Sequence, residues 1–293
     1  MNSRCHFVSF GSGRKGWSAA LRRLRKEIVR LDPEAQVWLF DESNVGDEIE
    51  GLDVGLSEFA RLHPRGYGYW VWQPWVILQV MKQAQPGDVV VYLDAGCTVH
   101  TSPASKLRYQ WYLDRIRHQG TLLFQQKYRE NSWTKRDVVE HFQFNEDDIE
   151  SGQILSGLQG HLVTQSGIEF VQSWLRTCTM DSGRLLLDVL SKANEDKRFI
   201  EHRHDQSILS CIGKIHKIEA LPDEIKYLAD GYMKGVPLND MLNSRARQES
   251  FAAINDETLK DDEINDLSSK VTTLDNQIER LERENRNYKN KTS

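Results

Sequence analysis

The sequence predicts a mixed α/β fold, in which helices flank a mostly parallel central sheet. Strand and helix patterns alternate up to residue 124, and this alternation is typical of strands that pair in parallel. The most apolar strand, VVVYL at 89–93, has no polar residue and is therefore expected to be buried on both faces. We expect residues 1–250 to form this domain.

The first forty residues indicate a strand–helix–strand unit. The short β-like run CHFVSF at 5–10 predicts a strand, and Gly11-Ser12-Gly13 ends it. A helix follows, because apolar residues then recur on one face as far as Leu31. Asp32-Pro33 ends the helix, and residues 37–40 form the second strand.

Later elements follow from the same patterns. The pattern predicts strands at 89–94 and 120–124, and a loop followed by a short helix over 199–215. The helix in the aromatic-rich region starts near Pro74, because proline suits a first helical turn. The longer helices are expected at 74–85, 107–118, 168–177 and 185–193.

The composition is that of a globular protein without special partners. A net charge of −5 gives no reason to expect nucleic acid. No window approaches the roughly 20 apolar residues of a membrane span, and the N-terminus has no apolar stretch of signal-peptide length, so export is not expected. The four cysteines are too far apart in sequence for a CxxC site, so we expect reduced, buried thiols.

From residue 261 the pattern becomes a heptad repeat. β-branched a positions with leucine at d favour a parallel two-stranded coiled coil; a trimer and a single amphipathic helix are the alternatives. The seam consists of Ile264, Leu267, Val271, Leu274, Ile278, Leu281, Asn285 and Tyr288. We expect 251–293 to be a linker and coiled coil that makes the chain a homo-oligomer, a dimer or trimer through 261–293. The seam reaches the last residues, and the sequence leaves open whether the natural chain continues beyond 293.

Asp94 ends the apolar strand and is followed by Ala95 and Gly96. Ligands of open parallel sheets bind at the carboxyl ends of strands. A carboxylate there can bind a divalent cation or a ribose hydroxyl, and two small residues let a bulky ligand approach the backbone. The alternative is that Asp94 caps the next turn.

Two stretches hold side chains that suit a nucleotide or sugar. RGYGYWVWQPW at 65–75 holds five aromatic residues, which could stack on a base or sugar or could belong to the core. In WTKRD at 133–137, Lys135 or Arg136 could hold a phosphate or could start a solvated helix. A further two stretches are rich in small or polar residues. They are SGQILSG at 151–157 and HRHDQS at 202–207, in which Asp205 could also be a helix N-cap.

In this order, RGYGYWVWQPW, GDVVVYLDAGC, WTKRD, a QxxxG segment and HDQS resemble bacterial GT-A-type glycosyltransferases of polysaccharide biosynthesis (O-antigen and capsule), related to retaining galactosyl- and hexosyltransferases. The resemblance covers residues 5–220. It implies a Rossmann-like half that binds a nucleotide-sugar, with a UDP-hexose as donor. It also implies a lipid-linked glycan acceptor and a cytoplasmic enzyme, peripheral at the inner membrane face.

The resemblance assigns a role to each stretch. Asp94 stands where the family has Asp-x-Asp, which holds a divalent metal (Mn²⁺ or Mg²⁺) and the diphosphate. The second acid is missing here, so the sequence leaves open whether Asp94 is a metal ligand. The expected donor-binding residues are Asp94, Ala95, Gly96, Gly11, Ser12, Arg65, Tyr69, Trp70, Lys135 and Arg136.

Asp205 is expected beside the anomeric carbon, as a base for the acceptor hydroxyl or as a stabiliser of oxocarbenium character. Gln206 and His204 are its expected catalytic neighbours. The QILSG stretch resembles the strand that faces the sugars in such enzymes, so Gln153, Ser156 and Gly157 are expected to bind the acceptor.

Two other functions fit parts of the sequence. A catalytically degenerate module could act as a scaffold through its coiled coil in a polysaccharide assembly complex. A nucleotidyltransferase would need a glycine-rich phosphate loop, which GSGRKG at 11–16 matches only in part. The same stretch is neither a Walker A motif nor a complete GxGxxG, so ATPase and dehydrogenase functions have little support.

Overall fold

A computed structural model describes residues 3–12, 15–223 and 242–245. Its main sheet has the strand order β2-β1-β3-β6-β5-β7. The strands are β1 (Cys5–Phe10), β2 (Gln36–Phe40), β3 (Val89–Leu93), β5 (Thr121–Arg129), β6 (Gly152–Leu162) and β7 (Leu221–Pro222). Strand β6 is antiparallel to both of its neighbours, and every other pair in this sheet is parallel. The predicted mostly parallel central sheet is therefore confirmed. A smaller sheet pairs β4 (Cys97–Val99) with β8 (Leu242–Arg245).

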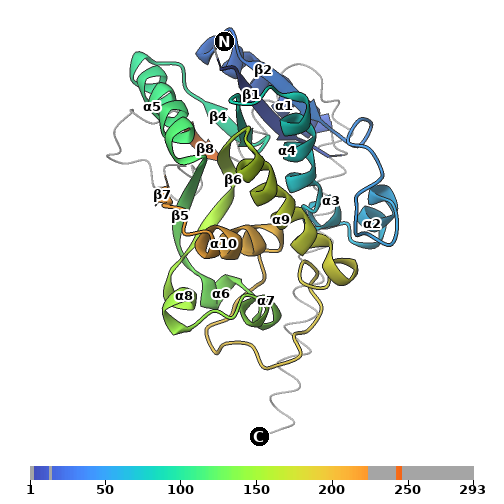
Figure 1. Cartoon of the computed structure of the whole chain (residues 1–293). Helices are drawn as coiled ribbons and strands as arrows, with labels where there is room; N and C mark the ends of the chain where they lie inside the picture. Colours follow the sequence, from blue (N-terminus) through green and yellow to red (C-terminus); the bar gives the residue numbers. More distant parts are fainter. Residues whose placement is uncertain (1–2, 13–14, 224–241, 246–293) are drawn as a thin grey trace, which may run out of the picture.

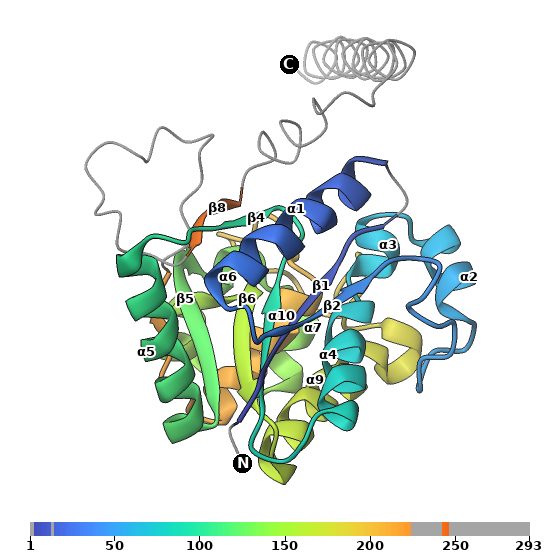
Figure 2. The same ribbon diagram turned by 90° about the horizontal axis from the view of Figure 1, so that it is seen from above.

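Helices cover both faces of the main sheet, as Figures 1 and 2 show. The longer helices are α1 (Lys15–Leu31), α4 (Trp72–Gln83), α5 (Pro103–Gln119), α9 (Gln165–Gly183) and α10 (Asp205–Ile215). The shorter ones are α2 (Leu56–Leu62), α3 (Gly66–Tyr69), α6 (Glu130–Trp133), α7 (Arg136–His141) and α8 (Glu146–Glu150). Helices α1 and α5 pack on one face, and α4, α9 and α10 form the opposite layer.

Side chains of the central strands alternate between two hydrophobic cores, as the period of a strand requires. In β1, Phe7 packs in the core beneath α1 and α5, and Val8 packs in the core beneath α4, α9 and α10. In β3, Val91 packs in the core beneath α1 and α5, and Tyr92 packs in the core beneath α4, α9 and α10. Burial of such side chains stabilises the fold by about 1.5–3 kcal/mol each. Both strands are buried along their whole length, which confirms the burial predicted for 89–93.

Most of the predicted elements are present, and one is wrong. No helix forms at 185–193. Instead, the carbonyl oxygens of 184–187 accept hydrogen bonds from side chains of other segments, and this use competes with the helical pattern. Helix α4 starts at Trp72 rather than Pro74, which places the proline inside the first turn, where its missing N–H costs little.

Three further expectations concern burial, membrane spans and the C-terminal segment. All four cysteines are buried and free, as expected. Among the described residues, no helix combines the length and the apolar character of a membrane span. The predicted coiled coil at 261–293 lies outside the described residues and stays a prediction.

Candidate functional site

The candidate site starts where β3 ends, in the turn that Asp94 opens. The backbone N–H of Cys97 donates to the Asp94 carbonyl at 2.9 Å, which closes a tight turn around the buried Ala95 and Gly96. The Tyr92 hydroxyl donates to Asp94 Oδ1 at 3.0 Å. Because Tyr92 and Asp94 are two residues apart in an extended segment, both side chains face the layer of α4, α9 and α10.

Strand β6 passes directly beside this turn. The Asp94 N–H donates to the Gly157 carbonyl at 3.0 Å. One residue earlier, the Ser156 N–H donates to Gln206 Oε1 at 3.3 Å, and the buried Gln73 amide donates to the Ser156 carbonyl at 2.6 Å. The Ser156–Gly157 dipeptide therefore contacts the Asp94 turn, the start of α10 and helix α4 at once.

The HDQS stretch begins helix α10. Asp205 is the first residue of this helix and not its N-cap, a position that His204 takes. Asp205 is buried, and its backbone carbonyl accepts a hydrogen bond from the Trp174 indole at 2.9 Å. Gln206 donates to Gln153 Oε1 at 2.6 Å and to Gln126 Oε1 at 3.3 Å. The structure thus connects Asp94, Ser156, Gly157, Gln153 and Gln206 by hydrogen bonds and chain neighbours, and Asp205 precedes Gln206 in the chain.

The aromatic stretch links the end of β1 to the HDQS stretch. Phe10, the last residue of β1, stacks on Trp72 with ring centroids 3.9 Å apart. In the middle of the stretch, the ring centroid of Tyr69 lies 4.3 Å from that of His204, and the ring centroid of Trp70 lies 5.8 Å from it. Both of these aromatic residues have positive φ angles, 52° and 61°, a strained conformation that commonly marks functional sites.

Arg65, at the start of the stretch, forms ion pairs with Glu201 and, at 3.6 Å, with Asp188. Both acids lie in the chain segment that precedes α10. Arg65 therefore fastens the aromatic stretch to this segment, and its guanidinium is shared between two carboxylates.

His204 is neutral and fixed in orientation. Its Nδ1 donates to the Leu186 carbonyl at 2.9 Å, because a carbonyl can only accept. Its Nε2 lies 3.8 Å from Asp188 Oδ1. Burial lowers the pKa of His204 to about 4, so at neutral pH the Nε2 atom carries a lone pair and no proton.

The two cations of WTKRD make contacts away from the Asp94 turn. Lys135 is buried, and its Nζ donates to the carbonyls of Arg184 and Leu187 at 2.6 and 2.8 Å. Burial lowers the pKa of this amine to about 8. Arg136 begins α7 and pairs with Glu140 at 2.8 Å. A phosphate would have to displace carbonyl oxygens from Lys135 to reach it.

Gly11 and Ser12 follow β1, next to β3 in the sheet. The Gly11 N–H donates to the Phe40 carbonyl at 3.0 Å. A Cβ on Gly11 would lie 3.0 Å from the Cβ of Trp17, so the close approach of α1 to the strand end leaves little room for a side chain here. Residues 13 and 14 lie outside the described part of the chain.

Sequence reasoning missed several polar residues of this region. The Arg23 guanidinium on α1 donates to the Ala95 carbonyl at 3.4 Å and to Thr98 Oγ1 at 3.0 Å, so a cation contacts the Asp94 turn. Gln73 and Gln126 hold the neighbouring strands and the α10 start. Their signal in the sequence was slight, because isolated arginine and glutamine residues are common on solvated helices and strands.

A divalent metal at Asp94 requires further ligands. Within 3–12, 15–223 and 242–245, no group of three or more His, Cys, Asp or Glu side chains is placed to share a metal ion. The described residues therefore do not complete a metal site around Asp94. The metal stays a prediction from the sequence resemblance, and no step proposed below passes through it.

The sequence matches no protein-family model and no curated protein. Among solved structures, the chain resembles glycosyltransferases. An active-site mutant of the galactosyltransferase LgtC is 12% identical, with a TM-score of 0.47 over 88% of this chain and 98% of its own. GlyE of Streptococcus pneumoniae TIGR4 is 13% identical, with a TM-score of 0.43 over 92% and 64% of the two chains. Mouse xyloside xylosyltransferase 1 is 11% identical, with a TM-score of 0.39 over 75% and 85%. At these values we transfer no residue role and no substrate to this chain.

Proposed function

We propose that this protein is a hexosyltransferase that moves a sugar from a nucleotide-sugar, a UDP-hexose, to a growing bacterial surface polysaccharide. The acceptor is a lipid-linked glycan at the cytoplasmic face of the membrane. The motif resemblance supplies the reaction class, the donor and the acceptor. The geometry supplies a reason to treat the separate motifs as one site.

The contacts of Ser156–Gly157 are the observation that supports the proposal most directly. They join the Asp94 turn, expected to bind the donor, to Gln206, expected to act at the reacting sugar. These segments are more than a hundred residues apart in sequence. Their meeting at the carboxyl edge of β3, where ligands of such sheets bind, supports a shared substrate site.

The reaction breaks the bond between the anomeric carbon and the diphosphate oxygen and forms a bond from that carbon to the acceptor oxygen. The acceptor hydroxyl loses its proton, and the leaving diphosphate departs with the electron pair. Asp205 is the proposed carboxylate beside the anomeric carbon, where it stabilises oxocarbenium character or accepts the proton. Gln206, held by three hydrogen bonds, would orient the sugar.

The leaving diphosphate needs positive potential nearby. Arg23, which also pairs with Glu27, places a guanidinium at the Asp94 turn, and the backbone amides at the start of α1 favour an anion. A divalent metal, when bound, would add to this neutralisation. Asp94 would then hold the ribose hydroxyl or the metal on the donor side.

Replacement of the reacting carboxylate tests the assignment. We expect Asp205→Asn to lower the transfer rate by about 10²–10⁴-fold, the range typical of acid–base groups, with an unchanged melting temperature. Asp147→Asn makes the same chemical change in the first turn of exposed α8 and serves as the control, with wild-type activity expected. Normal turnover by the folded Asp205 variant would show that another group does this chemistry.

Calorimetry with UDP and a panel of UDP-sugars, with and without Mn²⁺, tests the donor site. We expect at least one nucleotide-sugar to bind the wild-type chain. If none binds, the degenerate scaffold function becomes the better explanation, because Asp-x-Asp is incomplete here. Donor hydrolysis followed by NMR of the product then identifies the sugar and its anomeric configuration.

A further inference from the structure

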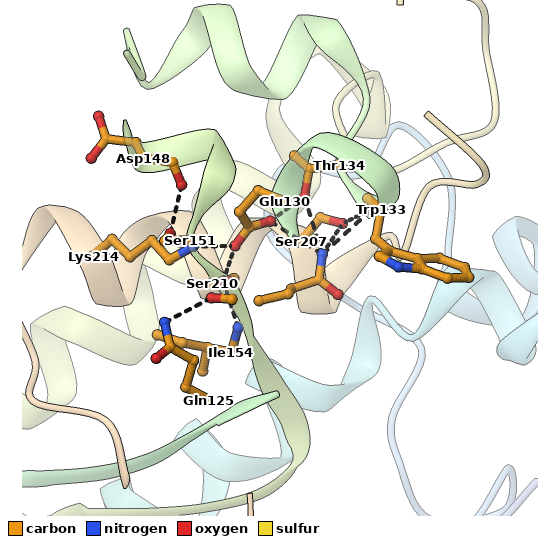
Figure 3. Close-up of polar contacts among 12 residues, drawn as sticks. Gln125, Glu130, Trp133, Thr134, Asp148, Ser151, Ile154, Ser207, Ser210 and Lys214 are labelled. Atoms are coloured by element: carbon orange, nitrogen blue, oxygen red, sulfur yellow. Dashed lines mark hydrogen bonds and ion pairs between the residues drawn. The ribbon is translucent and has the colours of Figure 1, made fainter. Parts of the chain in front are cut away.

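Glu130, the first residue of α6, is a fully buried carboxylate. The Lys214 Nζ lies 2.7 Å from Glu130 Oε1, and the Ser210 hydroxyl also donates to this oxygen. The other oxygen, Oε2, accepts from the Thr134 hydroxyl. Figure 3 shows Lys214, Ser210 and Thr134 converging on Glu130. Since a buried charge needs such partners, Glu130 is held as an ionised group.

An ionised carboxylate can only accept hydrogen bonds, and together with the Trp133 carbonyl, 3.4 Å from Gln153 Nε2, this property orients the neighbouring amide of Gln153. Gln153 Nε2 lies 3.2 Å from Glu130 Oε2, and the hydroxyl oxygens of Thr134 and Ser207 lie 3.1 and 3.2 Å from the same nitrogen. A rotated amide would point its oxygen at the carboxylate. The Gln153 oxygen must therefore face away from the carboxylate, toward the Gln206 side chain.

The orientation passes on to Gln206. Because Gln153 presents an oxygen, Gln206 must present its amide nitrogen, and the two atoms lie 2.6 Å apart. Gln206 Oε1 then faces the Ser156 N–H, which can only donate. The Glu130 carboxylate at one end of this chain of hydrogen bonds can only accept, and the Ser156 N–H at the other end can only donate. Both ends therefore favour the same orientation of the two glutamine amides.

We propose that Glu130 is a positioning residue of the candidate site: through Gln153, its carboxylate determines which atom of Gln206 faces the Ser156–Gly157 dipeptide. Glu130 itself does not touch the substrate. The consequence for sugar transfer rests on the proposed function, whereas the orientation of the two amides does not depend on it.

The decisive variant replaces both charges, Glu130→Gln with Lys214→Met. Glu130→Gln alone would leave the partly buried Lys214 without its counter-ion and is expected to destabilise the fold. The double variant keeps side-chain size and removes both charges, but its amide can donate toward Gln153. We expect a melting temperature near that of the wild type, a kcat reduced on the order of 10²-fold, as small misplacements of reacting groups cause, and little change in the KM for the donor.

Glu130→Asp gives the converse result and keeps the proposal testable if the double variant fails to fold. Its carboxylate still only accepts, but the shorter side chain packs less well. We expect it to be less stable than the double variant and yet more active. If activity follows stability across the variants, Glu130 has a purely structural role and the proposal is wrong.

A measurement without turnover separates this proposal from the proposed function. In the full chain labelled with ¹⁵N-glutamine, the side-chain NH₂ signals of Gln153 and Gln206 are assigned from Gln153→Met and Gln206→Met spectra. We expect both signals to shift in the double variant, and only slightly in Glu130→Asp. An unchanged Gln206 signal in the folded double variant overturns the proposal. A wild-type chain that transfers no sugar overturns the proposed function instead, and the NH₂ signals still decide the role of Glu130.

Discussion

His204 illustrates how a single residue of the site is fixed by its surroundings. Its ring is fully buried between Tyr69 and the segment that precedes α10, and its backbone has a φ of 51°. These constraints are consistent with a group that holds two segments together through the Leu186 carbonyl. The buried ring also makes the fold sensitive to acid.

We expect the free energy of unfolding to fall as the pH decreases from about 6.5 to about 4. The folded-state pKa of His204 is about 4, lowered by burial, so over this window the unfolded chain binds more protons than the folded chain. Stability therefore rises with pH between these values. Chemical denaturation of wild-type protein and His204→Asn at several pH values measures the effect.

The His204→Asn variant should show a smaller pH dependence in this window. His202, whose pKa burial also lowers, keeps part of the slope in the variant. His118→Asn, at the half-exposed end of α5, is the control and should retain the full slope. Identical slopes for all three proteins would show that His204 does not contribute.

At the same scale, the sequence draws attention to some residues of the candidate site and not to others. Asp94 and Asp205 stand out because each acid adjoins an apolar segment, where an acidic side chain needs a reason. Glu130 does not stand out, because a glutamate in a polar stretch is usually solvated. Its burial depends on Lys214 and Ser210, eighty or more residues away, and a single sequence gives no sign of that contact.

At the scale of elements, the segment before α10 shows how side chains can replace secondary structure. Lys135 binds two of its carbonyls, and His202 and His204 bind the two between them. The leucines at 185–187 favour a helix by pattern, which explains the wrong prediction at 185–193. The local pattern gives no sign of Lys135, His202 and His204, whose side chains donate hydrogen bonds to these backbone carbonyls.

We expect Lys135→Met to loosen this segment. The change leaves the Arg184 and Leu187 carbonyls without the amine, and an unsatisfied buried carbonyl costs about 1–3 kcal/mol. Hydrogen exchange followed by mass spectrometry should show faster exchange over 184–188, while β3 and β6 are unchanged. Lys197→Met, an exposed residue of the same segment, should leave the exchange as in the wild type. Slow exchange in the Lys135 variant would show that the amine is not needed to hold the segment.

At the scale of the whole molecule, the sequence predicted the α/β class well, because parallel strands buried on both faces leave long apolar runs. The strand order was not predictable. Strand β6 lies between β3 and β5, although both of these strands come before it in the sequence. Nothing in the local pattern of β6 indicates its partners, because pairing is decided by packing across both cores.

Residues 261–293 are the subject of a separate prediction at this scale. We expect a chain that ends at residue 260 to form particles with fewer chains than the full-length protein does, because the heptad seam is lost. Light scattering measures both masses, and calorimetry with the nucleotide-sugar checks that donor binding is kept. As a control, Leu274→Asp in the full chain should reduce the mass in the same way. The same number of chains per particle in all three proteins would contradict the coiled coil.

The position of β6 in the middle of the sheet limits which sequence changes the strand can accept during evolution. Its residues alternate between the two faces of the sheet, so insertion of one residue before Ser156 would turn every following side chain to the opposite face. If Ser156 and Gly157 bind the acceptor, as proposed, new acceptor preferences can arise there by exchange of side chains, but not by a change of length. The segment from 188 to 200, which has no ladder to keep in register, can accept insertions, and homologues with altered substrates should differ in length there.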